Sequence, residues 1–134
     1  METWIEQFND AQVHEIHALM AHEWWCSNRS IDEVQTVIDG SDLTLAALDN
    51  NQRISAFSRV LTDGIFKAVI FDVIVREDCR GTRLGEKLVE QLKQHPSLKH
   101  VKSLELYCPD RISGFYTKLG FKTSDSKLHR FLTG

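Results

Sequence analysis

The segment from Val73 to Leu88 reads V-I-V-R-E-D-C-R-G-T-R-L-G-E-K-L and combines a strand end, a turn and a helix start. The apolar, β-branched run Ile65–Val75 leads into the turn, and apolar residues at helical spacing follow it, namely Leu84, Leu88, Val89 and Leu92. Glycine lets a backbone approach a ligand closely, and free N–H groups at a helix start attract phosphate oxygens. Because Arg80 and Arg83 add positive charge, the turn predicts a pyrophosphate-binding loop; the plain alternative is a simple strand-to-helix connection.

Several other classes of protein are excluded or disfavoured by what the sequence lacks. It contains no G-x-x-x-x-G-K-[ST] motif, and no G-x-G-x-x-G motif follows the strand, which argues against nucleoside-triphosphatase and dinucleotide-binding folds. A net charge of −3 and a pI near 6.0 give no electrostatic case for nucleic-acid binding. No signal peptide and no apolar run of membrane-spanning length is visible, so we expect no membrane association.

Length and cysteine content fit a single compact unit. With 134 residues and 42% hydrophobic content, the chain predicts one domain, residues 1–134, around one core. Its three cysteines form no C-x-x-C pair, which is typical of a reduced, cytoplasmic protein. The pair His14 and His17 lacks further ligands at metal-binding spacing, and we predict no metal site.

The pattern of apolar residues predicts a mixed sheet. Helices are expected from Asn9/Asp10 to about His22 and over Ile31–Asp39, Thr82–Gln94 and Arg111–Leu119; strands over Leu43–Leu48, Ile54–Leu61, Ile65–Val75 and Val101–Tyr107; and a final hairpin within Phe121–Leu132. Three meander strands followed by a β-α-β-α order give an α/β (α+β) fold. Its mostly antiparallel sheet would have about six to seven strands with helices on both faces.

Two motifs carry a resemblance to a known family. Arg80-Gly81-Thr82-Arg83-Leu84-Gly85 resembles [Q/R]-x-x-G-x-[G/A], the acyl-CoA-binding signature of the GNAT superfamily of N-acetyltransferases. Phe115-Tyr116-Thr117-Lys118-Leu119-Gly120-Phe121 is similar to a second GNAT pattern, F-Y-x-x-x-G-F. Arg83 stands where the family usually has glycine; it could weaken backbone contact with the ligand or partly replace that contact with charge.

The resemblance implies an acetyl-CoA-dependent enzyme that acetylates a primary amine, preferably of a small molecule, by direct attack in a ternary complex. A non-catalytic acyl-CoA sensor or a protein-interaction module on the same fold is the alternative. The resemblance also implies that the strand Ile65–Val75 splays from its neighbour Val101–Tyr107 to admit the pantetheine arm of the cofactor. It further implies that this protein, as a small member of the family, forms a homodimer. The implied cofactor contacts are Val73, Ile74 and Val75 through their backbone and Arg80, Gly81, Thr82, Arg83, Leu84 and Gly85 around the pyrophosphate.

Candidate catalytic residues follow from chemistry and from the resemblance together. Asp72 is an acid within an apolar strand, so it is either a base for the amine or a structural partner of an arginine such as Arg59. The resemblance makes Tyr116 the acid that protonates the departing thiolate, with a packing tyrosine as the alternative. Glu105 is a second-choice base.

The acceptor side is expected near the first two helices. Trp24 and Trp25 stand in the loop between these helices and serve either as core anchors or as the aromatic wall of a substrate pocket. The resemblance favours the second role. The amine is expected to enter beside these tryptophans, Arg29 and Arg59, and alternation along the strand makes Glu105 a further substrate-binding candidate.

Overall fold

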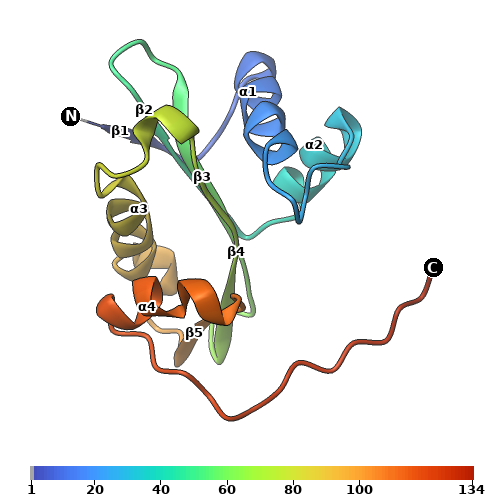
Figure 1. The fold of residues 1–134 in the computed structure, drawn as a ribbon, viewed down its shortest axis with the longest axis vertical. Helices are drawn as coiled ribbons and strands as arrows, with labels where there is room; N and C mark the ends of the chain where they lie inside the picture. The colour runs from blue at the N-terminus through green and yellow to red at the C-terminus, as the bar shows by residue number, and fades with distance from the viewer. Residues whose placement is uncertain (1) are drawn as a thin grey trace.

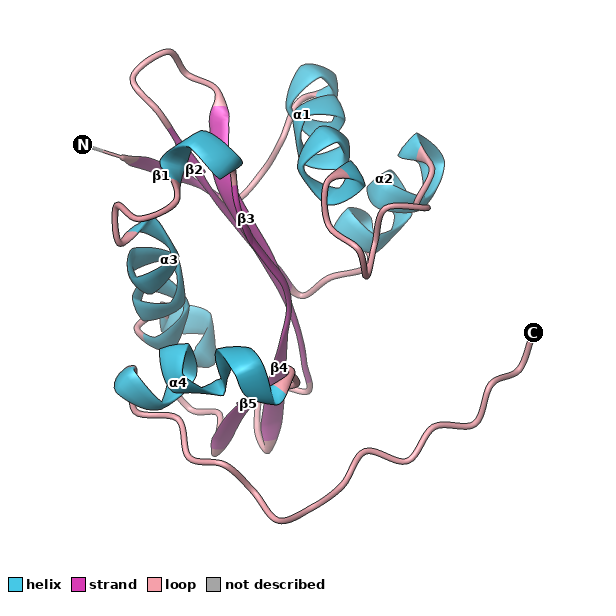
Figure 2. Cartoon of the chain, in the orientation of Figure 1, coloured by secondary structure: helices cyan, strands magenta, loops and turns pink. Residues whose placement is uncertain are grey.

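The computed structural model describes residues 2–134 and contains one five-stranded sheet (Figures 1 and 2). Its strands are β1 (Thr3–Ile5), β2 (Leu43–Leu48), β3 (Ile54–Thr62), β4 (Lys67–Val75) and β5 (Ser103–Leu106), and they lie side by side in that order. The first four run antiparallel to their neighbours, and β5 runs parallel to β4. The prediction of a mixed, mostly antiparallel sheet is therefore confirmed.

The helices lie on both faces of this sheet, as predicted. α1 (Asp10–Ala21) and α2 (Ile31–Asp39) lie on one face, and α3 (Leu84–Lys93) and α4 (Asp110–Lys118) lie on the other (Figure 1). The capping residues act as the sequence indicates. The side chains of Asn9 and Ser30 each accept a hydrogen bond from the backbone N–H of the third residue of the helix they begin. The side chain of that third residue accepts one from the backbone N–H of Asn9 or Ser30 in turn.

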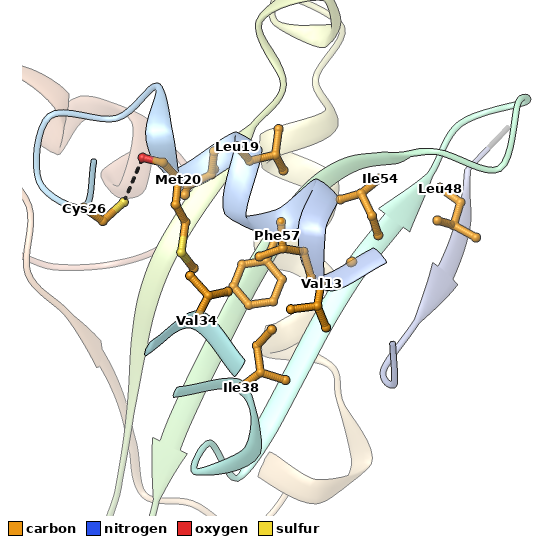
Figure 3. Packing of buried hydrophobic residues seen from close by; sticks show 12 residues of the cluster. Val13, Leu19, Met20, Cys26, Val34, Ile38, Leu48, Ile54 and Phe57 are labelled. Carbon is orange, nitrogen blue, oxygen red and sulfur yellow. Dashed lines mark hydrogen bonds between the residues drawn. The ribbon is translucent and has the colours of Figure 1, made fainter. Parts of the chain in front are cut away.

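Each face of the sheet has its own apolar cluster. Phe57 is fully buried at the centre of the first cluster, among side chains of α1 and α2 (Figure 3). On the opposite face, α3 packs Leu84, Leu88 and Leu92 against the sheet. Burial of a side chain such as Phe57 contributes about 2–3 kcal/mol. Every second residue of a strand faces the same side, so a two-faced core explains why β2 is buried along its whole length.

Two predictions about strands are wrong. Within residues 2–134 the sheet has five strands, not six to seven, because Phe121–Gly134 forms neither of the two strands of the expected hairpin. Residues Lys122–Lys127 of this segment are mostly polar, so the segment has no alternating apolar face that could pack against the sheet. The sequence also gave no signal for β1, which has three residues and is too short for a period-two pattern to be visible.

Candidate active site

The most informative feature of the sheet is a bulge in β4. Phe57 of β3 pairs with Ile74 of β4, and Arg59 pairs with Phe71. One residue of β3, Ser58, therefore lies opposite two residues of β4, Asp72 and Val73. One of those two is Asp72, whose φ of 57° lies in the left-handed region. Aspartate and asparagine tolerate this conformation better than most residues. A bulge of this kind bends the strand that carries it.

β4 pairs with β5 only over the residues that precede the bulge. Pairing between these parallel strands begins at Lys67 and ends at Ile70, which faces Leu106. From Phe71 to Val75 the outer edge of β4 has no neighbouring strand among residues 2–134. This unpaired stretch of β4 lies where the family resemblance implied an opening between the two strands, and it includes the bulge residues Asp72 and Val73.

At the end of this open edge, the loop into α3 presents free backbone N–H groups. Within residues 2–134, the N–H groups from Gly81 to Glu86 donate to no carbonyl or side chain, and Arg83 at the N-cap position gives no side-chain cap. The first turn of any helix has such free donors, and the helix dipole adds positive potential there. Gly81 adopts a φ of 81°, which favours glycine. The arrangement is suited to a diphosphate.

Gly85 allows α3 to approach its neighbours closely. A Cβ atom at this position would lie 3.4 Å from Phe115 Cζ and 3.5 Å from Val75 Cγ2. Phe115 belongs to α4 and Val75 to β4, so the predicted loop end is held against both elements. A side chain larger than alanine would push the loop away from the open edge of β4.

Arg80 spans the same corner. Its Nε donates to the Val75 carbonyl over 3.1 Å, and its Nη2 lies 2.8 Å from Glu23 Oε1 in the loop after α1. These residues line a hollow of about 280 Å³, together with Leu19, His22, Ile74, Arg76, Glu77 and Asp78. The predicted phosphate-binding arginine therefore occupies the end of the open edge and already has an anionic partner.

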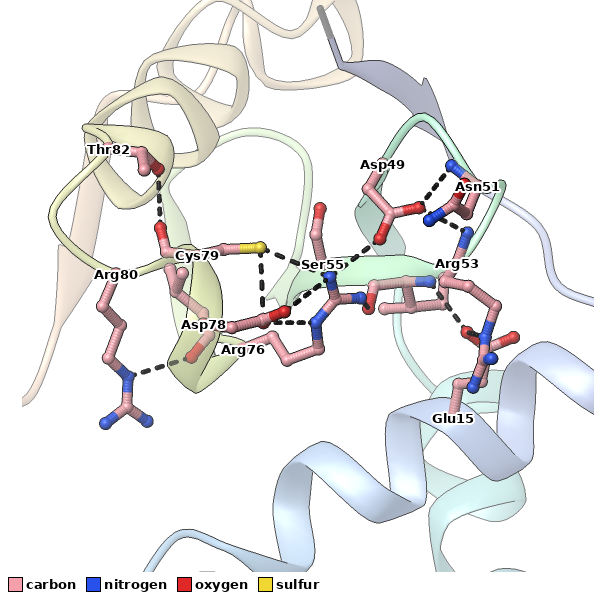
Figure 4. Close-up of polar contacts among 12 residues, drawn as sticks. Glu15, Asp49, Asn51, Arg53, Ser55, Arg76, Asp78, Cys79, Arg80 and Thr82 are labelled. Atoms are coloured by element: carbon pink, nitrogen blue, oxygen red, sulfur yellow. Dashed lines mark hydrogen bonds and ion pairs between the residues drawn. The ribbon is translucent and has the colours of Figure 1, made fainter.

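The start of the loop is anchored by Arg76 (Figure 4). Its guanidinium lies 2.7 Å from Asp49 Oδ2 and 2.6 Å from Asp78 Oδ1, and it donates to the Ile54 carbonyl. Thr82 Oγ1 in turn donates to the Cys79 carbonyl. These contacts fix where the loop leaves the sheet, and they raise the pKa of the Arg76 guanidinium through hydrogen bonds to the two carboxylates.

Asp72 is held by two arginines. Arg29 Nη1 and Arg59 Nε lie 2.8 Å and 2.7 Å from its Oδ2, and Arg29 Nη2 reaches Oδ1 at 3.3 Å. Burial alone would raise the pKa of this carboxyl, but the hydrogen bonds and charges of both guanidinium groups outweigh it and lower the pKa. The pairing with Arg59 that the sequence left open as an alternative is present, and Arg29 from a distant loop joins it.

Tyr116 lies buried on α4, between the rings of Phe115 and Phe121 in edge-to-face contacts. Burial, with a smaller effect from the nearby Cys108, raises the pKa of its phenol to about 12. The group therefore keeps its proton at neutral pH. That protonation state is the one a proton donor needs.

The two tryptophans do not serve as core anchors. Trp24 is 69% exposed and Trp25 42% exposed, and the two rings meet edge to face at 5.8 Å. The guanidinium of Arg111, at the start of α4, lies 5.8 Å from the Trp24 ring. Trp24 thus connects the loop after α1 with α4, from opposite faces of the sheet.

Glu105 lies apart from these residues on β5. It accepts a hydrogen bond from Ser103 Oγ at 2.8 Å, and its carboxylate lies 3.4 Å from Lys67 Nζ.

Two residues of the site, Glu23 and Arg111, were not predicted from the sequence, because they belong to a loop and to a helix start and carry no motif. Their only signal was position: each stands within a few residues of a predicted site residue.

His14 and His17, the two histidines that lie three residues apart on α1, each contact a backbone carbonyl. A ring nitrogen of His14 contacts the Asp10 carbonyl at 2.8 Å, and one of His17 contacts the Arg29 carbonyl at 2.9 Å. Over the described residues 2–134, no group of three or more His, Cys, Asp or Glu side chains is placed to hold a metal ion. No helix of that range is long and apolar enough to cross a membrane.

Arg83 adopts a φ of 66°, which explains why glycine is usual at this position. A left-handed residue with a Cβ costs about 1 kcal/mol. We expect both Arg83→Gly and Arg83→Ala to weaken coenzyme A binding about three- to tenfold, because both remove a cation beside the free amides. Isothermal titration of the two variants tests this. Tighter binding by Arg83→Gly than by the unaltered chain would show instead that the arginine obstructs the ligand.

Comparisons with known proteins agree with this geometry. The sequence pattern of the acetyltransferase (GNAT) domain matches residues 6–130. Serotonin N-acetyltransferase 2, chloroplastic, of Oryza sativa subsp. japonica is 42% identical over 66 residues, covering 49% of this chain and 33% of that protein. GCN5-related N-acetyltransferase 1, chloroplastic, of Arabidopsis thaliana is 31% identical over 94 residues, covering 69% and 48%. The chain thus spans between a third and a half of the length of these two relatives.

Solved structures show the same fold at low identity. A GNAT-family acetyltransferase, described as putative, from Xanthomonas campestris pv. campestris superposes with a TM-score of 0.81 at 24% identity, covering 97% of this chain and 94% of that one. Glucosamine-6-phosphate N-acetyltransferase from Arabidopsis thaliana gives 0.79 at 17% identity, covering 99% of both chains. Taken with the matched span 6–130, these results show that the chain belongs to the GNAT family of acetyltransferases.

Proposed function

We propose that this protein transfers an acetyl group from acetyl-CoA to a primary amine, by direct attack while both substrates are bound. The observation that carries the proposal is the open edge of β4, which leads directly to the free amides of the loop and α3. An extended pantetheine arm can hydrogen-bond to such an edge as an added strand does, while the pyrophosphate meets the amides. Family membership supports the same reaction class.

The chain's residues have distinct tasks in this proposal. Acetyl-CoA supplies the activated thioester. The backbone of Val73, Ile74 and Val75 aligns the pantetheine arm, and the amides of the loop residues hold the pyrophosphate: Arg80, Gly81, Thr82, Arg83, Leu84 and Gly85. Positioning of this kind accounts for much of the rate gain in transfer reactions. Tyr116, protonated at neutral pH, donates a proton to the sulfur as the thiolate leaves.

Removal of the amine's proton is better assigned to water than to Asp72. Two arginines already contact the Asp72 carboxylate, and its lowered pKa makes it a weak base. In our proposal Asp72 positions the bulge and the loop that carries Trp24 and Trp25. Glu105, which is half-buried on β5, remains a candidate base.

The acceptor is proposed to be a small-molecule amine. It would enter beside the exposed Trp24 and Trp25, and we propose Arg29 and Arg59, which hold Asp72, and Glu105 on β5 as the residues that bind its polar groups. We retain the cytoplasmic location and the lack of nucleic-acid and membrane partners as predictions. The rice and Arabidopsis relatives are both named as chloroplastic, which makes a plastid the alternative location.

Two measurements test the proposal. Coenzyme A and acetyl-CoA should raise the melting temperature of the purified protein in a concentration-dependent manner, since a ligand of the folded state stabilises it. A panel of small amines should then release free thiol from acetyl-CoA. Cofactor binding without turnover on any amine would favour the sensor alternative, and no binding would refute the cofactor site itself.

The Glu23–Arg80 ion pair predicts a gain in affinity on mutation. We expect Glu23→Gln to tighten coenzyme A binding about two- to fivefold, because Arg80 then contacts the phosphates without giving up an exposed ion pair. A double-mutant cycle provides the control: in an Arg80→Ala background the same change should have no effect. Equal tightening in both backgrounds would mean that Glu23 acts only through general charge.

A further inference from the structure

The arginines at the bulge carry more positive charge than the residues around them neutralise. Arg29 and Arg59 share the single carboxylate of Asp72, and the three side chains are 26%, 12% and 4% exposed. The thiol of Cys26 beside Arg29 stays neutral, because burial raises its pKa to about 11. Glu33, which is exposed on α2, adds only a further, smaller attraction for Arg29. Two cations and one anion leave one net positive charge in a half-buried place, where a charge normally has a partner.

Arg59 is the member of this cluster with unused hydrogen-bond donors. Its Nε donates to Asp72 Oδ2 over 2.7 Å, but among residues 2–134 its Nη1 and Nη2 donate to no acceptor. Both Nη atoms of Arg29, in contrast, contact the Asp72 carboxylate. No polar side-chain atom in the described part of the chain is both buried and unpartnered, so Nη1 and Nη2 of Arg59 reach the molecular surface. A ligand can therefore contact them.

The free end of Arg59 lies on the side of the sheet where the acceptor is proposed to enter. Arg59 follows Phe57 by two residues on β3, so both side chains lie on the face that carries α1 and α2 (Figure 1). Across the sheet it pairs with Phe71, whose ring centre lies 4.9 Å from the guanidinium carbon and which begins the unpaired stretch of β4. Arg29 ties the loop that carries Trp25 to the same bulge. The free donors thus adjoin both the open edge of β4 and the tryptophan loop.

We infer that the acceptor carries a carboxylate as well as its amine, and that Arg59 binds this carboxylate. Nη1 and Nη2 of a guanidinium present two parallel N–H groups, which match the two oxygens of a carboxylate. A single negative charge also balances the single positive charge of the cluster. A phosphate group, with a charge of about −1.5 to −2 at neutral pH, would exceed it, and the second amine of a diamine would be repelled. The substrate class is therefore an amino acid or a related amino carboxylate.

The inference deepens the proposed function and rests on it. In the transfer, the amine nitrogen forms a bond to the acetyl carbon, and the bond between that carbon and sulfur breaks. The amine's proton passes to water, Tyr116 protonates the sulfur, and the carboxylate takes no part. Arg59 is thus a specificity-determining residue, and its contribution appears in the choice between substrates.

Matched pairs of substrates test the inference. Leucine, phenylalanine and β-alanine are each compared with their carboxamides, which keep the amine and the shape but lose the negative charge. Free thiol released from acetyl-CoA gives kcat/KM for both members of each pair. For the pair that reacts fastest, we expect the unaltered protein to favour the carboxylate about ten- to hundredfold, the range for a hydrogen bond to a charged group. Because the ratio is taken within one protein sample, it does not depend on how much of that sample is folded.

Three variants assign the preference to Arg59. Arg59→Gln removes the free donors of the guanidinium and should bring the ratio close to one. Arg59→Lys keeps a cation beside Asp72 without the parallel donors, so we expect an intermediate ratio. Lys67→Gln is the control, since it removes a 66% exposed cation from the same face of the sheet and should leave the ratio unchanged. A ratio unchanged in Arg59→Gln would overturn the inference, as would equal rates for acid and amide in the unaltered protein.

A binding measurement separates this inference from the proposed function. With coenzyme A bound, the amino acids should raise the melting temperature of the unaltered protein more than their amides do, whether or not transfer occurs. Equal shifts by acid and amide would overturn the carboxylate site alone. A larger shift by the acids without any release of thiol would retain the carboxylate site and refute the transfer reaction.

Discussion

Replacing Asp72 by asparagine is expected to lower the free energy of unfolding by about 2–3 kcal/mol. The Asp72 side chain is only 4% exposed, and the substitution leaves the guanidinium groups of Arg29 and Arg59 without their counter-charge. Breaking a fully buried ion pair costs about 3–5 kcal/mol, and the partial exposure of Arg29 reduces that figure. Asparagine is isosteric and tolerates a φ of 57°, so the loss reports charge rather than backbone strain.

Chemical denaturation of the two proteins measures this loss, with Asp78→Asn as the control. Asp78 also pairs with an arginine, but its side chain is 70% exposed, so its replacement should change stability far less than that of Asp72. An Asp72→Asn protein no less stable than Asp78→Asn would show that the two arginines do not depend on the carboxylate.

The ion pairs of Asp72 with Arg29 and Arg59 also predict how the stability of the protein depends on pH. The folded-state pKa of Asp72 is lowered, so its contribution is complete above the unfolded value of about 3.9 and is lost as pH falls through the folded value. The stability difference between the unaltered protein and Asp72→Asn should therefore be constant at neutral pH and shrink below about pH 4.

Replacing Tyr116 by phenylalanine is expected to lower kcat about a hundredfold on whichever amine the acceptor screen identifies. The hydroxyl is the only group lost, and the ring contacts with Phe115 and Phe121 remain. Because the pKa of Tyr116 is raised to about 12, the phenol stays protonated and able to donate up to about pH 11. KM for acetyl-CoA should change little.

The exposed tyrosine provides a matched comparison. Tyr107 is 64% exposed beside β5, and Tyr107→Phe should retain nearly full turnover. If Tyr116→Phe also turns over at the normal rate with an unchanged melting temperature, Tyr116 is a packing residue and the leaving thiolate takes its proton from elsewhere.

Local sequence patterns predicted most of the fold. The capping boxes at Asn9 and Ser30 and the spacing of Leu84, Leu88 and Leu92 depend on residues within one or two helical turns. The same holds for β2, whose predicted and observed bounds coincide at Leu43–Leu48. Such signals are visible in a single sequence because the interacting residues are neighbours along the chain.

The features that build the candidate site arise from distant contacts. Arg29 and Asp72 are 43 residues apart, and Arg80 and Glu23 are 57 apart, so no local pattern links them. The left-handed conformation of Arg83 was equally hidden, because arginine gives no hint of a positive φ. The expected final hairpin is absent for another reason: Phe121–Leu132 has room for two strands, but its residues provide no alternation of apolar and polar side chains.

The bulge at Asp72 has an implication for how such a site could arise. Ile70 and Val73 lie on the α3 side of β4, while Phe71 and Ile74 lie on the other, so omitting Asp72 would leave the alternation of the remaining side chains intact. A chain one residue shorter at this point would therefore keep the same core, with β3 and β4 paired in continuous register. The single additional residue thus bends β4 beside the candidate site without requiring any buried apolar side chain to change places.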